Sequence, residues 1–479
     1  MSALWVLPPL VVAGAAARLG AGVRHAALLL LAGASVSLAF AVGLFNGVAR
    51  EERLLDGYLR VDTAARLFLL LVTTVFWGVS IYVVTRTRTS EKLTSMLPRF
   101  AALGVTLYSL CALSLLSNHL VLTWVLLEAS TLAGTLLVML RDRQAARRAA
   151  WRYLLFSTVG LGLALLGLAC LGHAMGEHGH TVTFHVDELI TRNELGHDVW
   201  SRLGLALILL GYGTKAGLAP MHVWLPETYD EAPPAVTALL AAVQFNAVML
   251  ALFRVLSVYR AEVRDLVSTE LVFMGLGTMV VATVQLVGTT NYKRFIAYAS
   301  MNHAGVIAVG LGVGKLAAYG VLLYVFSNAL VKAVLFLTCG LIKSHYRTKD
   351  MTRLRNLVNE MPFSGMFFLL GTFALLGFAP FGSFLGEVLI LSALIDTGHY
   401  FVFAAMCFLL TVVFIVTGRA LFPMVWGERQ QQSGVPRESA LSALSNMVFV
   451  AILVLLGVFL PDSASDMLQQ VANQMGGLP

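Results

Sequence analysis

The chain has 479 residues, of which 58% are hydrophobic and 12% are charged, with a formal net charge of +7. An average soluble domain has about 25% charged residues, so this composition excludes a soluble globular protein. It predicts an all-α polytopic membrane protein. At roughly 20 apolar residues per span, the chain has room for about 14 transmembrane helices.

The first apolar segment, residues 3–17, is predicted to be a retained helix. Its first basic residue, Arg18, follows the apolar run, whereas a cleaved signal peptide carries its positive charge in front. Two of the later spans contain prolines and are predicted to be broken helices, 202–224 and 362–396. The other predicted spans are 26–46, 64–85, 97–117, 119–140, 151–175, 235–258, 268–288, 294–314, 317–342, 399–425 and 442–460.

The positions of the 33 lysines and arginines predict the orientation of the chain. Loops after odd-numbered helices carry 21 of them, regions after even-numbered helices carry 10, and Lys215 and Lys332 lie inside spans. Cytoplasmic loops are enriched in these residues. We therefore expect a multi-pass protein of the cell inner membrane with both termini on the periplasmic or extracellular side. Topology also explains the positive charge, so no nucleic-acid partner is expected.

The sequence predicts no metal, cofactor or catalytic residue within this chain. The four cysteines stand alone in apolar segments, whereas iron–sulfur and zinc sites need clustered thiolates, and no nucleotide-binding motif occurs. Region 173–197 is rich in histidine but has no metal-site spacing, so a solvated loop is expected, with metal binding as the alternative. Its histidines are His173, His178, His180, His185 and His197.

A short motif occurs twice, as GLAP at 217–220 and GFAP at 377–380. Pro220 and Pro380 break the seventh and twelfth predicted helices. Since these helices are five apart, the two halves have opposite orientations, which is typical of inverted repeats in transporters. The predicted units are peripheral helices over 1–96, a first five-helix repeat over 97–258, a second over 268–425, and a C-terminal helix and tail over 426–479.

Ionisable residues within the spans point to transport. Glu128 and Lys215 have no partner in their own helices, and a lone charge at mid-membrane costs at least ~2.5–3.5 kcal/mol. We therefore expect the two to pair and their separation to control the proton on Lys215, with a static ion pair as the alternative. His222 is expected to relay protons or to cap the broken helix. With His303, Lys332 and Glu387 added, the set could form a water-linked proton relay.

Four stretches resemble the antiporter-like subunits of complex I, Mrp antiporters and membrane-bound hydrogenases. They cover residues 211–240, 289–305, 327–342 and 377–391. The chain is most similar to the hydrogenase-4 component F type, because Phe381 follows the second break and Asn246 stands where complex I subunits often have a lysine or histidine. The resemblance implies 14 helices, pairing of Glu128 with Lys215, a central axis through His303 and Lys332, and an exit at Glu387. Asn246 becomes a polar link bridged by water.

The resemblance implies a proton-translocating subunit that is not an enzyme by itself. Its expected partners are the lipid bilayer, other membrane subunits, and peripheral iron–sulfur and nickel–iron hydrogenase or quinone-oxidoreductase-like subunits. One alternative is an Mrp-type cation/proton antiporter subunit without a redox partner. Another is the membrane partner of a zinc-dependent inorganic-carbon uptake protein, and a third is a purely structural anchor.

Overall fold

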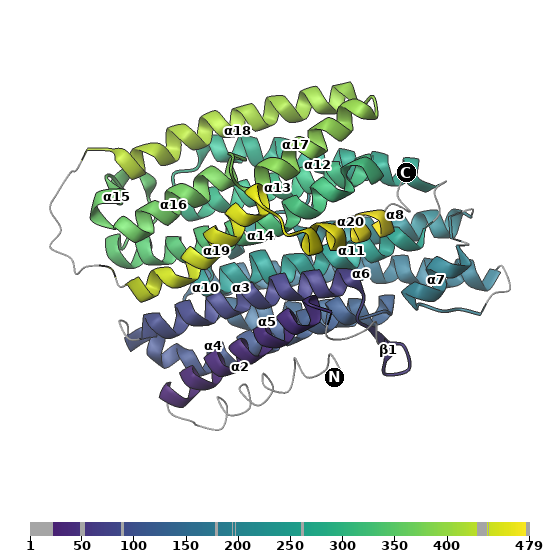
Figure 1. The fold of residues 1–479 in the computed structure, drawn as a ribbon, viewed down its shortest axis with the longest axis horizontal. Coiled ribbons are helices and arrows are strands. Elements are labelled where there is room, and N and C mark those ends of the chain that lie inside the picture. Colours follow the sequence, from purple (N-terminus) through teal and green to yellow (C-terminus); the bar gives the residue numbers. More distant parts are fainter. Residues whose placement is uncertain are drawn as a thin grey trace.

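The computed structural model describes residues 23–47, 53–87, 91–177, 181–193, 195–196, 198–259, 263–428, 438 and 440–475. The predicted helix at 3–17 and three of the loop histidines, His178, His180 and His197, lie outside these residues. The described chain is mostly helical, in agreement with the predicted fold class. Most of its helices run roughly side by side in one bundle (Figure 1).

The first part of the bundle contains long apolar helices and one short hairpin. The two strands of the hairpin pair antiparallel, Arg53 with Arg60 and Leu54 with Leu59. The elements are α2 (Val23–Phe45), β1 (Arg53–Leu54), β2 (Leu59–Arg60), α3 (Thr63–Thr87), α4 (Glu91–Leu116), α5 (Leu120–Val138), α6 (Gln144–Glu177) and α7 (Val186–Arg192).

The predicted break at Pro220 is present. Helix α8 (Val199–Ala216) ends at Gly217, whose φ of 86° is left-handed, and α9 (Trp224–Glu231) begins after the break. A glycine suits this cap, because a Cβ there would lie 2.3 Å from Leu225. The next span combines α10 (Pro234–Ala238), the π-helix η2 (Leu239–Gln244) and α11 (Phe245–Val258). No sequence pattern predicted the π-helical turn.

The predicted break at Pro380 is also present, between α16 (Pro362–Leu375) and α17 (Gly382–Asp396), and both Ala-Pro bonds at the two breaks are cis. The other elements of this part are α12 (Arg264–Gly288), α13 (Tyr292–Val313), α14 (Lys315–Tyr346), η4 (Met351–Arg353), α15 (Leu357–Glu360), α18 (Tyr400–Trp426), α19 (Ala440–Val458) and α20 (Asp462–Met475).

Within the described residues, ten helices are long and apolar enough to cross a membrane. The number is eleven if α19 and α20, which meet at 74°, form one bent span. The two broken helices are not among the ten, so the predicted total of about 14 stays a prediction. Helix α20 was not predicted, because its sequence is amphipathic and not apolar throughout.

Burial orders the helices from the centre outward. The apolar windows of α14 and of the span Pro234–Val258 are 100% buried, whereas those of α18 and α2 are only 22% and 33% buried. Helix α14 is apolar on all sides, which is typical of a core helix, and it runs between α18 and α2 in Figure 1. Helix α3, which the sequence groups with the peripheral helices, is 78% buried.

Candidate functional site

Lys215 lies in the last turn of α8, directly before the helix break, and its side chain is buried, with 4% exposed. Its Nζ donates to Thr131 Oγ1 at 2.7 Å and to Tyr153 OH at 2.9 Å. The ammonium also lies 4.5 Å from the centroid of the Tyr153 ring. Helices α5, α6 and α8 therefore meet at this one lysine, and hydroxyl groups and an aromatic face hold its charge.

The expected partner of Lys215 occupies a different place. Glu128 lies on α5, three residues before Thr131, and its Oε1 accepts a hydrogen bond from Thr158 Oγ1 at 2.7 Å. Its Oε2 is buried without a hydrogen-bond partner among the described residues. Within that part of the chain, Glu128 and Lys215 form no direct ion pair. The predicted direct pairing of Glu128 with Lys215 is therefore not present among the described residues. Thr131, one helical turn after Glu128 on α5, contacts the lysine instead.

Tyr153 extends the lysine network toward the middle of the bundle. Its hydroxyl donates to Gln244 Oε1 at 2.7 Å, and Gln244 Nε2 donates to Ser130 Oγ at 2.8 Å. Gln244 is the last residue of the π-helix η2. No sequence pattern predicted these four residues, because uncharged polar side chains in apolar helices stand as isolated positions without a motif. They are Thr131, Tyr153, Gln244 and Ser130.

Lys332 lies at the centre of α14 with only 1% of its surface exposed. Its Nζ is 3.9 Å from the centroid of the Phe245 ring. No carboxylate pairs with Lys215 or Lys332 within the described chain. Phe245 follows Gln244 directly, so of two consecutive residues at the end of the π-helix one contacts Lys332 and the other contacts Tyr153, the partner of Lys215. A π-helical turn is frequently found at a functional site.

His303 on α13 forms a hydrogen bond between Nδ1 and the hydroxyl of Tyr324 on α14, with ring centroids 5.3 Å apart. Glu387 on α17 is half-buried and packs against the second break. A Cβ on Gly377, whose φ is 66°, would lie 2.8 Å from Glu387 Oε2. Each break therefore lies beside one ionisable residue, Lys215 at the first and Glu387 at the second, as the sequence predicts.

Several buried polar atoms in this region have no hydrogen-bond partner among the described residues. Asn246 is 0% exposed; its Nδ2 donates to Ala242 O, but its Oδ1 has no partner. Leaving such an atom dry costs about 1–3 kcal/mol, and ordered water usually satisfies it. Other examples are Asn302 Oδ1, Ser327 Oγ and both polar side-chain atoms of Asn328. Asn302 is next to His303 in the sequence, and Asn328 lies one helical turn before Lys332.

His222 lies in the break between α8 and α9, and its Nδ1 is also without a partner among the described residues. The N-cap position of α9 is Val223, and no side chain caps that helix. His222 therefore does not cap the N-terminus of α9.

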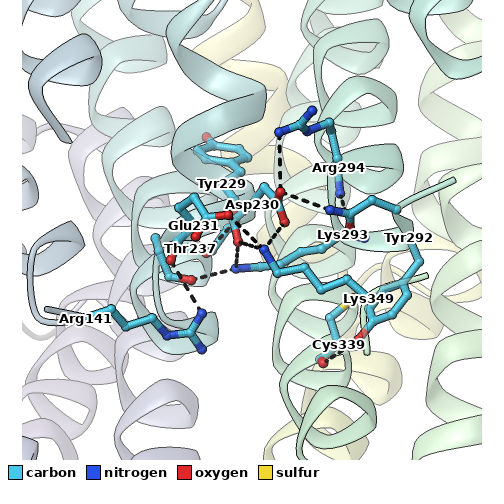
Figure 2. Close-up of polar contacts among 12 residues, drawn as sticks. Arg141, Tyr229, Asp230, Glu231, Thr237, Tyr292, Lys293, Arg294, Cys339 and Lys349 are labelled. Atoms are coloured by element: carbon cyan, nitrogen blue, oxygen red, sulfur yellow. Dashed lines mark hydrogen bonds and ion pairs between the residues drawn. The ribbon is translucent and has the colours of Figure 1, made fainter. Parts of the chain in front are cut away.

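The acidic end of α9 is held by cations from the second half of the chain (Figure 2). Lys349 Nζ contacts Asp230 Oδ1 at 2.6 Å and Glu231 Oε1 at 3.1 Å. The buried Lys293 donates to the main-chain oxygens of Asp230 and Ala232, at 3.2 and 2.7 Å. These bonds join the half-helix α9 to the start of α13 and to the segment after α14.

Asp230 is the centre of this group. Asn291 Nδ2 donates to its Oδ2 at 3.0 Å, and Arg294 lies 3.5 Å from the same oxygen. Burial would raise the pKa of Asp230, but the charge and hydrogen bond of Lys349, with Lys293 and Asn291, hold it below the usual range. The carboxylate is therefore an anchor that stays ionised.

The histidine-rich region was predicted to be a solvated loop. His185 forms an isolated bridge with His119, the N-cap of α5, and the rings of both lie about 5 Å from Tyr58. Burial and the neighbouring His185 lower the pKa of His119, whose Nδ1 accepts from Leu122 N. Within the described residues no group of three or more histidine, cysteine or acidic side chains is placed to hold a metal ion.

Comparison with known proteins agrees with this arrangement. The family described as NADH:quinone oxidoreductase/Mrp antiporter, transmembrane, matches residues 117–414, more than half of the chain. The chain belongs to this family. The matched region contains Glu128, Lys215, Lys332 and both helix breaks. The predicted membership is confirmed, and the chain is an antiporter-like membrane subunit.

Individual relatives support the same assignment. A hydrogenase-4 component F homolog of Methylacidiphilum infernorum is 31% identical over 298 residues, or 59% of this chain and 60% of that protein. The NADH-quinone oxidoreductase subunit N 2 of Chloroherpeton thalassium is 29% identical over 353 residues, or 72% of this chain and 68% of that protein. The alignment with the hydrogenase-4 homolog therefore spans about three-fifths of that relative.

The fold is shared with a subunit of a solved respiratory complex. A chain of the archaeal membrane-bound sulfane sulfur reductase superposes with a TM-score of 0.87 at 20% identity, covering 99% of this chain and 97% of that chain. At this identity the similarity shows the fold.

Proposed function

We propose that the chain translocates protons as a membrane subunit of a membrane-bound hydrogenase or complex I-like redox complex. One observation carries the proposal: Lys215 and Lys332 are both buried, neither has a carboxylate partner in the described chain, and their surroundings meet at Gln244 and Phe245. A buried lysine without a counter-ion is costly in a membrane and typically marks an ion pathway.

The first half of the proposed route starts at Glu128. Its unpartnered Oε2 and the hydroxyl of Thr131, one turn on, lie along the same helix, and Thr131 contacts Lys215. A shift of α5 that brings the carboxylate to the lysine would stabilise the ammonium form. The opposite shift would leave hydroxyl groups as its only partners and favour proton release. A redox step in a partner subunit would drive this shift.

The route then crosses the centre of the bundle. Tyr153 and Gln244 form the hydrogen-bonded link from Lys215, and Asn246 lies two residues further along α11 with one unpartnered oxygen. Because asparagine does not carry a proton, water bridges to Lys332 in this proposal. His303 and Glu387 complete the series, and His222 in the first break connects to it through water.

We also infer that residues 97–258 and 268–425 are inverted five-helix repeats within a 14-helix fold, with both termini outside the cytoplasm. Support comes from the two breaks, each with a left-handed glycine three residues before its proline and an ionisable residue beside it. The partners we propose are other membrane subunits and peripheral iron–sulfur and nickel–iron or quinone-oxidoreductase-like subunits.

The test uses the intact complex, purified with its partner subunits and reconstituted into proteoliposomes. Proton uptake per electron transferred is measured for Lys215→Met and Lys332→Met, with Lys315→Met as the control because Lys315 is an exposed lysine on the same helix as Lys332. We expect each buried-lysine variant to lose most of the pumping and the control to retain it. Normal pumping by Lys215→Met would refute the mechanism.

The co-purified subunits separate this proposal from its alternatives. Co-purification of Mrp subunits, together with sodium or potassium flux driven by a proton gradient and no redox activity, would identify the chain as a subunit of a cation/proton antiporter. Co-purification of a large zinc protein would identify it as a proton-conducting partner of inorganic-carbon uptake.

A further inference from the structure

A cavity of about 480 Å³ opens among the ends of several helices, and neither Lys215 nor Lys332 lines it. Its walls come from α3, α4, the segment after α5, the α9–α10 connection and the end of α14. The sequence predicts that the loops after the third, fifth and eleventh helices share one side of the membrane. Their convergence on one cavity agrees with that prediction and places the cavity where the helices leave the bilayer.

One part of the cavity wall is strongly basic. Five cationic side chains line it and no acidic side chain does: Arg86, Arg141, Arg143, Lys343 and Arg347. Arg143, Lys343 and Arg347 form no ion pair with any described residue. The nearby acids Asp230 and Glu231 are already bound by Lys349. Five like charges around one cavity repel one another, so an anion bound among them would relieve that repulsion.

Arg141 shows the effect of this crowding. Its guanidinium lines the cavity and donates to the main-chain oxygen of Glu231 at 3.5 Å. Burial and the adjacent Arg143 lower the pKa of Arg141. Glu231 and Asp230 offset these two effects only in part, and an anion bound in the cavity would add further opposite charge.

The other part of the wall is apolar. Val83 on α3 and Leu97 and Phe100 on α4 line it, and Pro233 and Pro234 close it on the side of the broken helix. A small soluble anion such as phosphate would leave this surface in contact with water. A ligand with an anionic head and a hydrocarbon tail satisfies both parts of the wall.

We propose that this cavity binds an anionic phospholipid of the cytoplasmic leaflet, with its phosphate among the five cations and an acyl chain along Val83, Leu97 and Phe100. The site is independent of the proton route, since it contains none of the route's residues. Basic pockets between transmembrane helices on the cytoplasmic side are known to suit such headgroups.

The experiment measures retained lipid on the full-length chain in its complex, delipidated in detergent and analysed by native mass spectrometry. Phosphatidylglycerol is added at a series of concentrations, with phosphatidylcholine in parallel and with inorganic phosphate as competitor. The test variant is Arg143→Gln/Arg347→Gln. The control, Arg148→Gln/Arg419→Gln, removes two exposed arginines that do not line the cavity.

We expect the wild type to retain phosphatidylglycerol in preference to phosphatidylcholine. The double cavity variant should bind it about 30-fold more weakly, because each cation near an anionic lipid contributes roughly fivefold, and the control should bind like the wild type. A second variant, Leu97→Trp, fills the apolar part without changing charge and should also lose phosphatidylglycerol.

Three results would overturn the proposal. Equal retention of phosphatidylcholine would show that the cations are not used. Displacement by millimolar inorganic phosphate would identify a soluble-anion site. Unchanged phosphatidylglycerol binding by assembled Arg143→Gln/Arg347→Gln and by Leu97→Trp would place the lipid elsewhere.

Discussion

Removing the hydroxyl of Tyr153 tests whether the link between Lys215 and Gln244 works as the structure indicates. Tyr153→Phe deletes the acceptor of the bond from Lys215 and the donor of the bond to Gln244. The ring stays, and with it the contact 4.5 Å from the ammonium. The variant therefore isolates the hydroxyl.

The magnitude follows from the two lost bonds. A hydrogen bond to a charged group contributes about 1.5–3 kcal/mol and a neutral one about 1 kcal/mol. Tyr153→Phe should therefore destabilise the chain by about 2.5–4 kcal/mol, since Lys215 keeps only one hydrogen bond, to Thr131, and the Gln244 oxygen is left unsatisfied. The rate of proton uptake should fall at least about tenfold, because a positioned proton donor or acceptor contributes about 10²–10⁴ in the rate of proton transfer.

Tyr259→Phe is the matched control. The Tyr259 hydroxyl is buried but has no partner among the described residues, so its removal should cost nothing. Stability is measured by thermal unfolding of the detergent-solubilised complex, and pumping by fluorescence quenching in proteoliposomes. If the Tyr153 and Tyr259 variants behave alike in both assays, the hydroxyl of Tyr153 is not a link in the route.

Three further perturbations address the structure around the route. Asp230→Asn should destabilise the complex by about 3 kcal/mol at pH 7, because it leaves Lys349 without its shortest partner. Because the pKa of Asp230 is lowered in the folded chain, the carboxylate stabilises the fold at any pH above the ordinary pKa range of aspartate. This stabilisation is lost as the pH falls through the pKa of Asp230 in the folded chain, so the melting temperatures of variant and wild type should converge in acid. The pKa of His119 is lowered in the folded chain, so its contribution to the free energy of unfolding weakens as the pH falls through about 6.5. His119→Asn keeps a side-chain acceptor for the N-cap and should flatten the loss of thermal stability between about pH 7 and 5. The same dependence of melting temperature on pH in variant and wild type would contradict this. Gly217→Ala should cost about 1–3 kcal/mol by thermal unfolding, because φ is 86° and the new methyl meets Leu225, whereas an unchanged melting temperature would show that the break relaxes freely.

Features of the fold that depend on residues near one another in the sequence could be predicted from it. Apolar runs located the described spans, and the prolines located both breaks. The burial of Lys215 and Lys332 followed from their positions within apolar runs. The partners of Lys215 did not follow, because Thr131 and Tyr153 are 84 and 62 positions away along the chain. Glu128 was expected as the partner instead, because an acidic residue within an apolar span stands out in the sequence, whereas nothing in the sequence shows which hydroxyl groups are buried beside the lysine.

Local sequence therefore determined which residues are buried and where the helices break, and it predicts which side of the membrane the cations prefer. The tertiary structure alone decided what those residues contact. It placed Glu128 one turn from Thr131, which contacts Lys215, and brought Gln244 to Tyr153 and Ser130 through a π-helical turn. It also gathered five cations from α3, the segment after α5 and the end of α14 around one cavity. Helix packing sets these distances, and packing depends on small differences in side-chain shape over the whole bundle.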